Sequence, residues 1–402
     1  MTLSPARVPV GAPGVRRLTA TLYGYAFLDE FVLLYPVYAL LFADTGLSVG
    51  QMSSLFVLWS ATGVLLEVPS GAWADAVSRR LLLWLGPLLG AAGFALWVLV
   101  PSYWAFAAGF VLWGVRGALG SGALEALVYE ELERLGAADR YARIMGRAHA
   151  AGQAAVMTAM ALAGPVFAAY GYPAVGAASV LACLLCAATA TRFPEHRAAA
   201  SADGEGEGEE EAHGWVSTLR AGIAEARRNR PVRGALLLVP AVAAVWGSLD
   251  EYTPLLARET GASDGVIPYL LMMVWAGVTA GSLLSGPAGR LGRGGFAALL
   301  AASALALALG AGTGTPAGLA LVALAFGGFQ LATVLADARL QQRIEGTARA
   351  TLTSVAGLGT ELATITVYGT YAHLASTTTH GTTFALFAVP CLVVASAVAV
   401  RR

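Results

Sequence analysis

The sequence predicts an all-α integral membrane protein with twelve transmembrane helices, and three observations predict it. Of the 402 residues, 57% are hydrophobic and only 12% are charged, which is more apolar than the average soluble domain. Apolar runs of about 20 residues, long enough to cross a bilayer as helices, recur along almost the whole chain. These runs are continuous, whereas the strands of a membrane barrel alternate in hydrophobicity.

The expected spans divide six and six around a polar segment. In the first half they are 20–43, 52–70, 81–100, 103–128, 145–169 and 173–191, and in the second half 234–257, 265–287, 295–313, 317–338, 351–373 and 381–400. No cleavable signal peptide is expected, because the first apolar run is long enough to remain in the membrane. We therefore expect an N-terminal six-helix bundle at 1–191, a cytoplasmic linker at 192–233 and a C-terminal six-helix bundle at 234–402.

The linker has two parts of different composition. The stretch "SADGEGEGEEEAHG" is rich in Gly and Glu, has almost nothing to bury and is expected to be disordered. Trp215, Leu219 and Ile223 follow it on one face of a possible helix. This pattern is typical of an amphipathic helix at the membrane surface, or of a soluble connector helix.

The arginines indicate how the chain is oriented. All 25 basic residues are Arg, and most of them fall at alternate connections between the expected spans. Because cytoplasmic connections carry the excess of positive charge, we expect those connections and both termini to face the cytoplasm. The expected location is the bacterial cytoplasmic (inner) membrane, with a multi-pass topology.

The two halves of the sequence resemble each other. The tripeptide "LDE" occurs at 28–30 in the first span and again at 249–251 in the seventh. The stretch "PSGAWAD" after the second span has a weaker counterpart, "LSGPAGR", after the eighth. Matches at corresponding positions favour an ancestral duplication, which predicts two bundles related by a pseudo-two-fold axis.

Three short motifs carry a family resemblance. In "GAWADAVSRR" the residues Gly71, Asp75, Arg79 and Arg80 occupy the positions of a loop signature, although Ala76 and Ser78 depart from it. "RGALGSGA" supplies Arg116, Gly120, Gly122 and Ala123, and "GPVFAA" from Gly164 is half of a third signature. On these motifs the chain resembles the major facilitator superfamily of secondary transporters, and within it the bacterial drug and metabolite efflux permeases.

The resemblance implies a conformational latch at Gly71, Asp75, Arg79 and Arg80. Gly71 is expected in a tight cytoplasmic turn, and the two arginines are expected to interact with anionic headgroups. In the resembling family the Asp is thought to hold the two halves together on the cytoplasmic side. The candidate partners of Asp75 are Arg134, Arg140 and the start of the span at 351–373; the alternative is a solvated loop carboxylate.

Charged residues inside the expected spans are the candidate site. Each costs about 2.5–3.5 kcal/mol at the middle of the bilayer, so such residues are rarely present without a function. In the resembling family the first, fourth, seventh and tenth spans line the central cavity. That resemblance implies a proton-coupling and cavity set on these spans: Asp29, Glu30, Arg116, Asp250, Glu251 and Gln330. Adjacent helical residues point about 100° apart, so Asp29 and Glu30 do not both face the cavity squarely, and Asp29 is favoured. The alternative is an Arg–carboxylate pair that only fixes helix packing.

Aromatic side chains on the same spans are candidates for a substrate wall. The four expected there are Tyr25, Trp113, Trp246 and Tyr252. Interfacial belts of Trp and Tyr are the alternative explanation.

These features and the resemblance lead to a transport hypothesis. The first hypothesis is proton-coupled antiport that exports an amphipathic or drug-like compound; the alternative is proton-coupled uptake of a polar or anionic metabolite. A membrane enzyme is disfavoured, because no metal-ligand cluster, nucleophile–base arrangement or phosphate loop is expected. A membrane sensor is disfavoured because no soluble output domain is expected. The expected partners are a small-molecule substrate, protons and the lipid bilayer, with no nucleic acid, cofactor or metal, and the expected state is a monomer.

Overall fold

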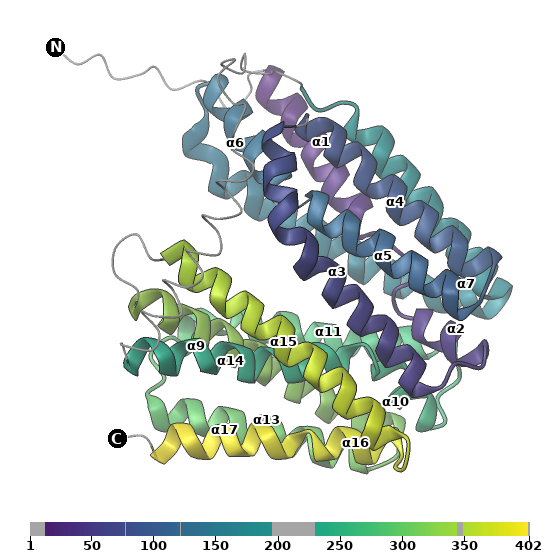
Figure 1. The fold of residues 1–402 in the computed structure, drawn as a ribbon, viewed down its shortest axis with the longest axis vertical. Coiled ribbons are helices and arrows are strands. Elements are labelled where there is room, and N and C mark those ends of the chain that lie inside the picture. The colour runs from purple at the N-terminus through teal and green to yellow at the C-terminus, as the bar shows by residue number, and fades with distance from the viewer. Residues whose placement is uncertain (1–12, 77, 121, 195–229, 344–348, 401–402) are drawn as a thin grey trace. The chain divides into compact units, whose positions relative to one another are not determined.

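The computed structural model describes residues 13–76, 78–120, 122–194, 230–343 and 349–400. All regular elements in these ranges are helices (Figure 1). Seven of them are long and apolar enough to cross a membrane, and two shorter apolar helices lie at Leu236–Asp250 and Ile267–Leu283. The all-α membrane fold is therefore confirmed, while the count of twelve spans stays a prediction. The expected helix at Trp215–Ile223 lies outside the described residues.

The chain forms two compact units, residues 1–35 with 62–207 and residues 36–61 with 208–402. The predicted division into a bundle at 1–191, a linker at 192–233 and a bundle at 234–402 stays a prediction. The first unit contains α1 (Pro13–Glu30), α4 (Arg79–Leu99), α5 (Tyr103–Gly120), α6 (Ala123–Arg134), η1 (Ala138–Arg140) and α7 (Tyr141–Ala190). The long helix α3 (Val49–Ala76) contributes residues to both units.

The second unit contains the remaining helices. They are α2 (Tyr38–Asp44), α9 (Arg230–Asp250), α10 (Thr253–Glu259), α11 (Ile267–Leu283), α12 (Ser285–Ala288), α13 (Arg293–Gly312), η2 (Pro316–Gly318), α14 (Leu319–Arg343), α15 (Arg349–Ala375), α16 (His380–Leu386) and α17 (Ala388–Val400).

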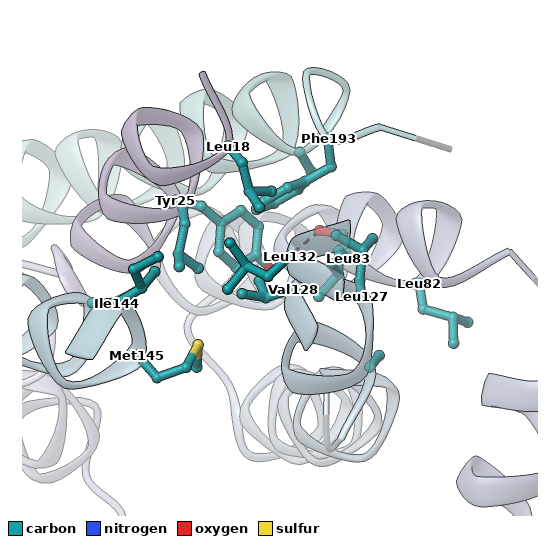
Figure 2. Packing of buried hydrophobic residues seen from close by; sticks show 14 of the residues in the cluster. Leu18, Tyr25, Leu82, Leu83, Leu127, Val128, Leu132, Ile144, Met145 and Phe193 are labelled. Atoms are coloured by element: carbon teal, nitrogen blue, oxygen red, sulfur yellow. Dashed lines mark hydrogen bonds between the residues drawn. The ribbon is translucent and has the colours of Figure 1, made fainter. Parts of the chain in front are cut away.

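One core cluster of the first unit is built from apolar side chains of five helices, α1, α4, α5, α6 and α7. Figure 2 shows Leu18 and Tyr25 from α1, Leu82 and Leu83 from α4, Leu127, Val128 and Leu132 from α6, Ile144 and Met145 from α7, and Phe193 after α7. Leu119 of α5 belongs to the same cluster. Burying these side chains together fixes the five helices against one another, which holds Asp29 of α1 and Arg116 of α5 in place.

The first expected span, 20–43, is not one helix. It ends at Glu30 and resumes as α2 at Tyr38. Pro36 explains the interruption, because its ring has no N–H to donate and collides with the carbonyl of residue 32 in a continuous helix. The hydroxyl of Ser179 on α7 accepts a hydrogen bond from the backbone N–H of Leu34 at 3.0 Å, so a side chain satisfies part of the broken backbone.

The seventh expected span, 234–257, breaks at the matching place. Helix α9 ends at Asp250, and α10 begins at Thr253 with Pro254 in its first turn. In both halves the helix therefore ends within the repeated "LDE" tripeptide and a proline follows. The sequence repeat marks a repeated helix break.

Two other boundaries differ from the predicted ones. Residues 71–76, expected in a turn, continue α3 to Ala76, so the prediction of a turn at Gly71 is wrong; Ala72, Ala74 and Ala76 are strong helix formers. The expected spans 145–169 and 173–191 correspond to α7, which changes direction at Gly171. The backbone φ of Gly171 is +68°, a conformation that side-chain-bearing residues rarely adopt.

Helices α11 and α14 approach each other through glycine. A Cβ added to Gly277 would lie 2.3 Å from the carbonyl oxygen of Ala323, and one added to Gly281 would lie 2.0 Å from that of Gly327. Small residues of this kind let membrane helices pack backbone against backbone.

Candidate functional site: charges at the two helix breaks

The best-defined charge pair lies at the end of α1. Arg116 of α5 donates from Nη2 to Oδ1 of Asp29 at 2.6 Å and to the backbone carbonyl of Asp29 at 2.9 Å. The Arg116 side chain is 9% exposed and that of Asp29 is 32% exposed. A buried guanidinium is therefore balanced by a carboxylate that remains partly accessible.

One nitrogen of this guanidinium has no partner. Among the buried side-chain nitrogen and oxygen atoms of the described residues, Nη1 of Arg116 alone lacks a hydrogen bond. It lies against α4, where a Cβ on Gly90 would be 2.9 Å away. A buried donor without an acceptor costs about 1–3 kcal/mol, so the present arrangement of Arg116 is not its best-satisfied one.

Cys186 and Tyr35, which the sequence analysis did not include, lie near the pair, together with the expected wall residue Trp113. The thiol of Cys186 on α7, fully buried, donates to Oδ1 of Asp29 at 3.8 Å. The ring of Tyr35 stacks on Trp113 with centroids 5.2 Å apart, and Trp113 lies one helical turn before Arg116. The spacing of Gly86 and Gly90 in the α4 sequence is the signal that could have indicated a close neighbour there.

Glu30 is the last residue of α1 and is half-buried. It packs against α7, where a Cβ on Gly152 would lie 3.3 Å from Cγ of Glu30. The structure therefore places the two adjacent acids differently: Asp29 forms an ion pair with Arg116, and Glu30 packs beside Gly152 of α7.

Asp250 and Glu251 stand at the corresponding break in the second unit. Asp250 ends α9, Glu251 follows it, and both are half-buried. Neither side chain has an ion pair or hydrogen bond with another residue of the described part of the chain. The C-terminal end of a helix carries partial negative charge, which adds to the cost of keeping a carboxylate ionised there.

Tyr252, next along the chain, is packed on all sides. Its hydroxyl lies 2.6 Å from Oγ of Ser53, and its ring stacks on Tyr371 with centroids 3.6 Å apart. Nearby in the same unit, Arg258 forms ion pairs with Asp44 at 2.6 Å and with Asp264 at 2.8 Å. Tyr252 is fully buried here, and its role as a substrate wall stays a prediction.

The other expected wall and cavity residues each have a defined contact. Gln330 donates from Nε2 to Oγ of Ser282 at 2.9 Å, and Trp246 donates to Oγ1 of Thr333 at 3.2 Å. Tyr25 is buried, with its hydroxyl donating to the carbonyl of Leu83 at 3.2 Å.

The expected latch is only partly visible. The side chain of Asp75 lies outside the part of the structure that describes side chains, so its proposed partner stays a prediction. Arg79 pairs with Glu130 of α6 at 2.5 Å, and Arg134, one of the expected partners, pairs with Glu131 within α6. Arg80 lies in the first turn of α4, and its expected interaction with headgroups stays a prediction. No cluster of three or more His, Cys, Asp or Glu suited to a metal ion occurs among the described residues.

Comparison with solved structures gives the same fold. The chain is similar to the nucleoside transporter NupG, with a TM-score of 0.74 and 13% identity over 96% of this chain and 98% of that one. It is also similar to the POT family transporter PepTSo, with a TM-score of 0.68 and 12% identity over 95% and 97% of the two chains. A mutant of the peptide transporter POT in complex with alafosfalin gives a TM-score of 0.70 and 14% identity over 98% and 95%.

Comparison of the sequence itself identifies the family. No curated protein matches the chain. The profile described as Major Facilitator Superfamily matches residues 19–368, which is most of the chain. The chain therefore belongs to the major facilitator superfamily and is a membrane transporter of the secondary kind.

Proposed function

We propose that this secondary transporter exports a small amphipathic or drug-like compound across the bacterial cytoplasmic membrane in exchange for protons, by alternating access. Both termini face the cytoplasm in this proposal, and the working unit is a monomer. No cofactor is involved, because the proton gradient supplies the energy.

The observation that carries the proposal is the pair Asp250 and Glu251 at the break between α9 and α10. Proton-driven exchange needs an acid that is neutral on one side of the membrane and ionised on the other. A half-buried carboxylate without a cationic partner in the described chain suits that task, because a proton is the simplest way to neutralise it. Asp29 suits it less, since protonating it would leave Arg116 as an unpaired buried cation.

The residues of the first unit then supply the other half of the mechanism. Arg116 and Asp29 bind and release the compound, with Glu30 next to them at the end of α1. Asp75, on the last turn of α3, remains the proposed latch on the cytoplasmic side. Exchange follows if the transporter switches between its inward-open and outward-open states only when it carries either the compound or protons.

A second candidate is proton-coupled uptake of a polar or anionic metabolite. Arg116 favours it, because its Nη1 has two N–H groups free for a polar compound. The nucleoside and peptide transporters with the same fold also carry polar compounds, as their names state.

Proton flux in liposomes tests the proposal. The purified protein is reconstituted around a pH-sensitive dye, and test compounds are chosen because they raise its melting temperature. With an acidic interior, adding such a compound outside is expected to alkalinise the interior, because protons leave as the compound enters. Proton entry together with the compound would support the uptake candidate, and no coupled proton movement with any stabilising compound would contradict both.

A further inference from the structure

We propose that Arg116 binds the acidic group of the transported compound, a carboxylate that takes the place now held by Asp29. This inference rests on the transport function proposed above. It adds the class of compound, an amphipathic organic anion.

The first argument is the unused donor on Arg116. Asp29 contacts only Nη2, through one side-chain oxygen and its backbone carbonyl, while Nη1 is buried without a partner. The guanidinium is a planar fork that matches the two oxygens of one carboxylate. Asp29 is fixed to α1 and reaches one nitrogen, whereas a free carboxylate can bind Nη1 and Nη2 together.

The second argument is access. Asp29 is about three times as exposed as Arg116, 32% against 9%, so it lies on the more accessible side of the pair. Displaced from Arg116, its carboxylate is already partly exposed and keeps the thiol of Cys186 as a donor. The group that an incoming anion replaces is itself a carboxylate, so the site already accommodates this chemistry.

The third argument is the close fit of the guanidinium against Gly90. Gly90 has no side chain, and a Cβ there would be 2.9 Å from Nη1 and 3.2 Å from Cδ of Arg116. Any larger residue would push the guanidinium away from α4. Gly90 therefore sets the position at which Arg116 presents its two nitrogens to an acceptor.

The fourth argument is the apolar surface next to the charge. Trp113 and Arg116 are three residues apart on α5, so their side chains share a face of that helix. Tyr35 stacks on Trp113, and Phe94 packs edge-on against Trp113 at 5.7 Å. A cation beside an aromatic cluster matches a compound with an acidic group on an apolar body.

Calorimetric titration of the full-length protein tests the inference with two matched probes. 1-Naphthoate carries the carboxylate, and 1-naphthamide has the same body without the charge. We expect 1-naphthoate to bind and 1-naphthamide to bind at least about tenfold more weakly, because hydrogen bonds between charged groups are stronger than those to a neutral amide. Arg116→Lys, which keeps the charge but loses the fork, is expected to weaken 1-naphthoate about tenfold.

Asp29→Asn gives the most specific result. Removing the competing carboxylate is expected to tighten 1-naphthoate binding, whereas an ion pair that only fixes packing would give no gain. Gly90→Ala is expected to weaken binding, and Gly117→Ala, whose added Cβ has no atom within 4 Å, is the matched control. If Arg116→Lys does not fold, the two glycine variants decide.

Three outcomes would overturn the inference: equal binding of the two probes, unchanged or weaker 1-naphthoate binding in Asp29→Asn, or equal effects of the two glycine variants. The titration uses one pH and no gradient, so it is independent of proton coupling. Anion binding without proton flux in liposomes would overturn the proposed function alone. Proton flux with stabilising compounds regardless of their charge would overturn the inference alone.

Discussion

Replacing Asp250 with Asn and Glu251 with Gln in one chain is expected to reduce proton-coupled transport to the level of empty liposomes. Both replacements keep the size and much of the hydrogen-bonding capacity of the side chains but remove the groups that gain and lose a proton. Because neither acid has a partner in the described part of the chain, no ion pair is broken and the fold is expected to persist.

Two measurements separate this result from general damage. Exchange of labelled for unlabelled compound across the membrane, with no pH gradient, needs no net proton movement and is expected to continue. The control is Glu133→Gln with Asp139→Asn, two exposed acids outside the helix breaks, which should transport as the unmodified protein does. Coupled proton flux in the Asp250 and Glu251 double variant would remove this pair from the mechanism.

Gly281→Ala is expected to cause the largest loss of stability of any single methyl addition discussed here. The new Cβ would lie 2.0 Å from the carbonyl oxygen of Gly327, and that oxygen belongs to a helix backbone that cannot move alone. Helices α11 and α14 would have to separate along their contact. Overpacking of this kind costs about 1–3 kcal/mol, and more where the neighbour is rigid.

Thermal melting in detergent measures the effect. Gly247→Ala on α9 is the matched control, because an added Cβ there has no atom within 4 Å and Ala favours a helix more than Gly does. We expect the melting temperature of Gly281→Ala to fall by several degrees and that of Gly247→Ala to stay or rise. Equal melting of the two variants would show that the two helices do not depend on this close approach.

The sequence predicts the class of fold and the position of the charges, because both depend on local properties. Hydropathy identifies the membrane helices and the charged residues within them, and the Arg–carboxylate pair that the structure shows was one of the alternatives left open. The repeated "LDE" indicated equivalent positions in the two halves. It did not reveal that a helix ends at each, although Pro36 and Pro254 carried that signal.

The remaining features depend on neighbours that are distant in the sequence. The thiol of Cys186 lies beside Asp29 only because α1 and α7 pack together, and a Cys-x-x-Cys inside an apolar run gave no sign of it. The free donor of Arg116 depends on the orientation of one guanidinium between two helices. Periodicity and composition contain no information about either arrangement.

The hydrogen bond from Arg116 to the main-chain carbonyl of Asp29 links the ligand chemistry to helix geometry. The carbonyls of the last turn of any helix have no N–H donor within that helix, and inside a bilayer each needs a donor from elsewhere. Arg116 provides one, and so it serves as a C-terminal cap of α1. Whatever draws the guanidinium away from Asp29 also uncaps α1, and the final turn of that helix is then free to unwind.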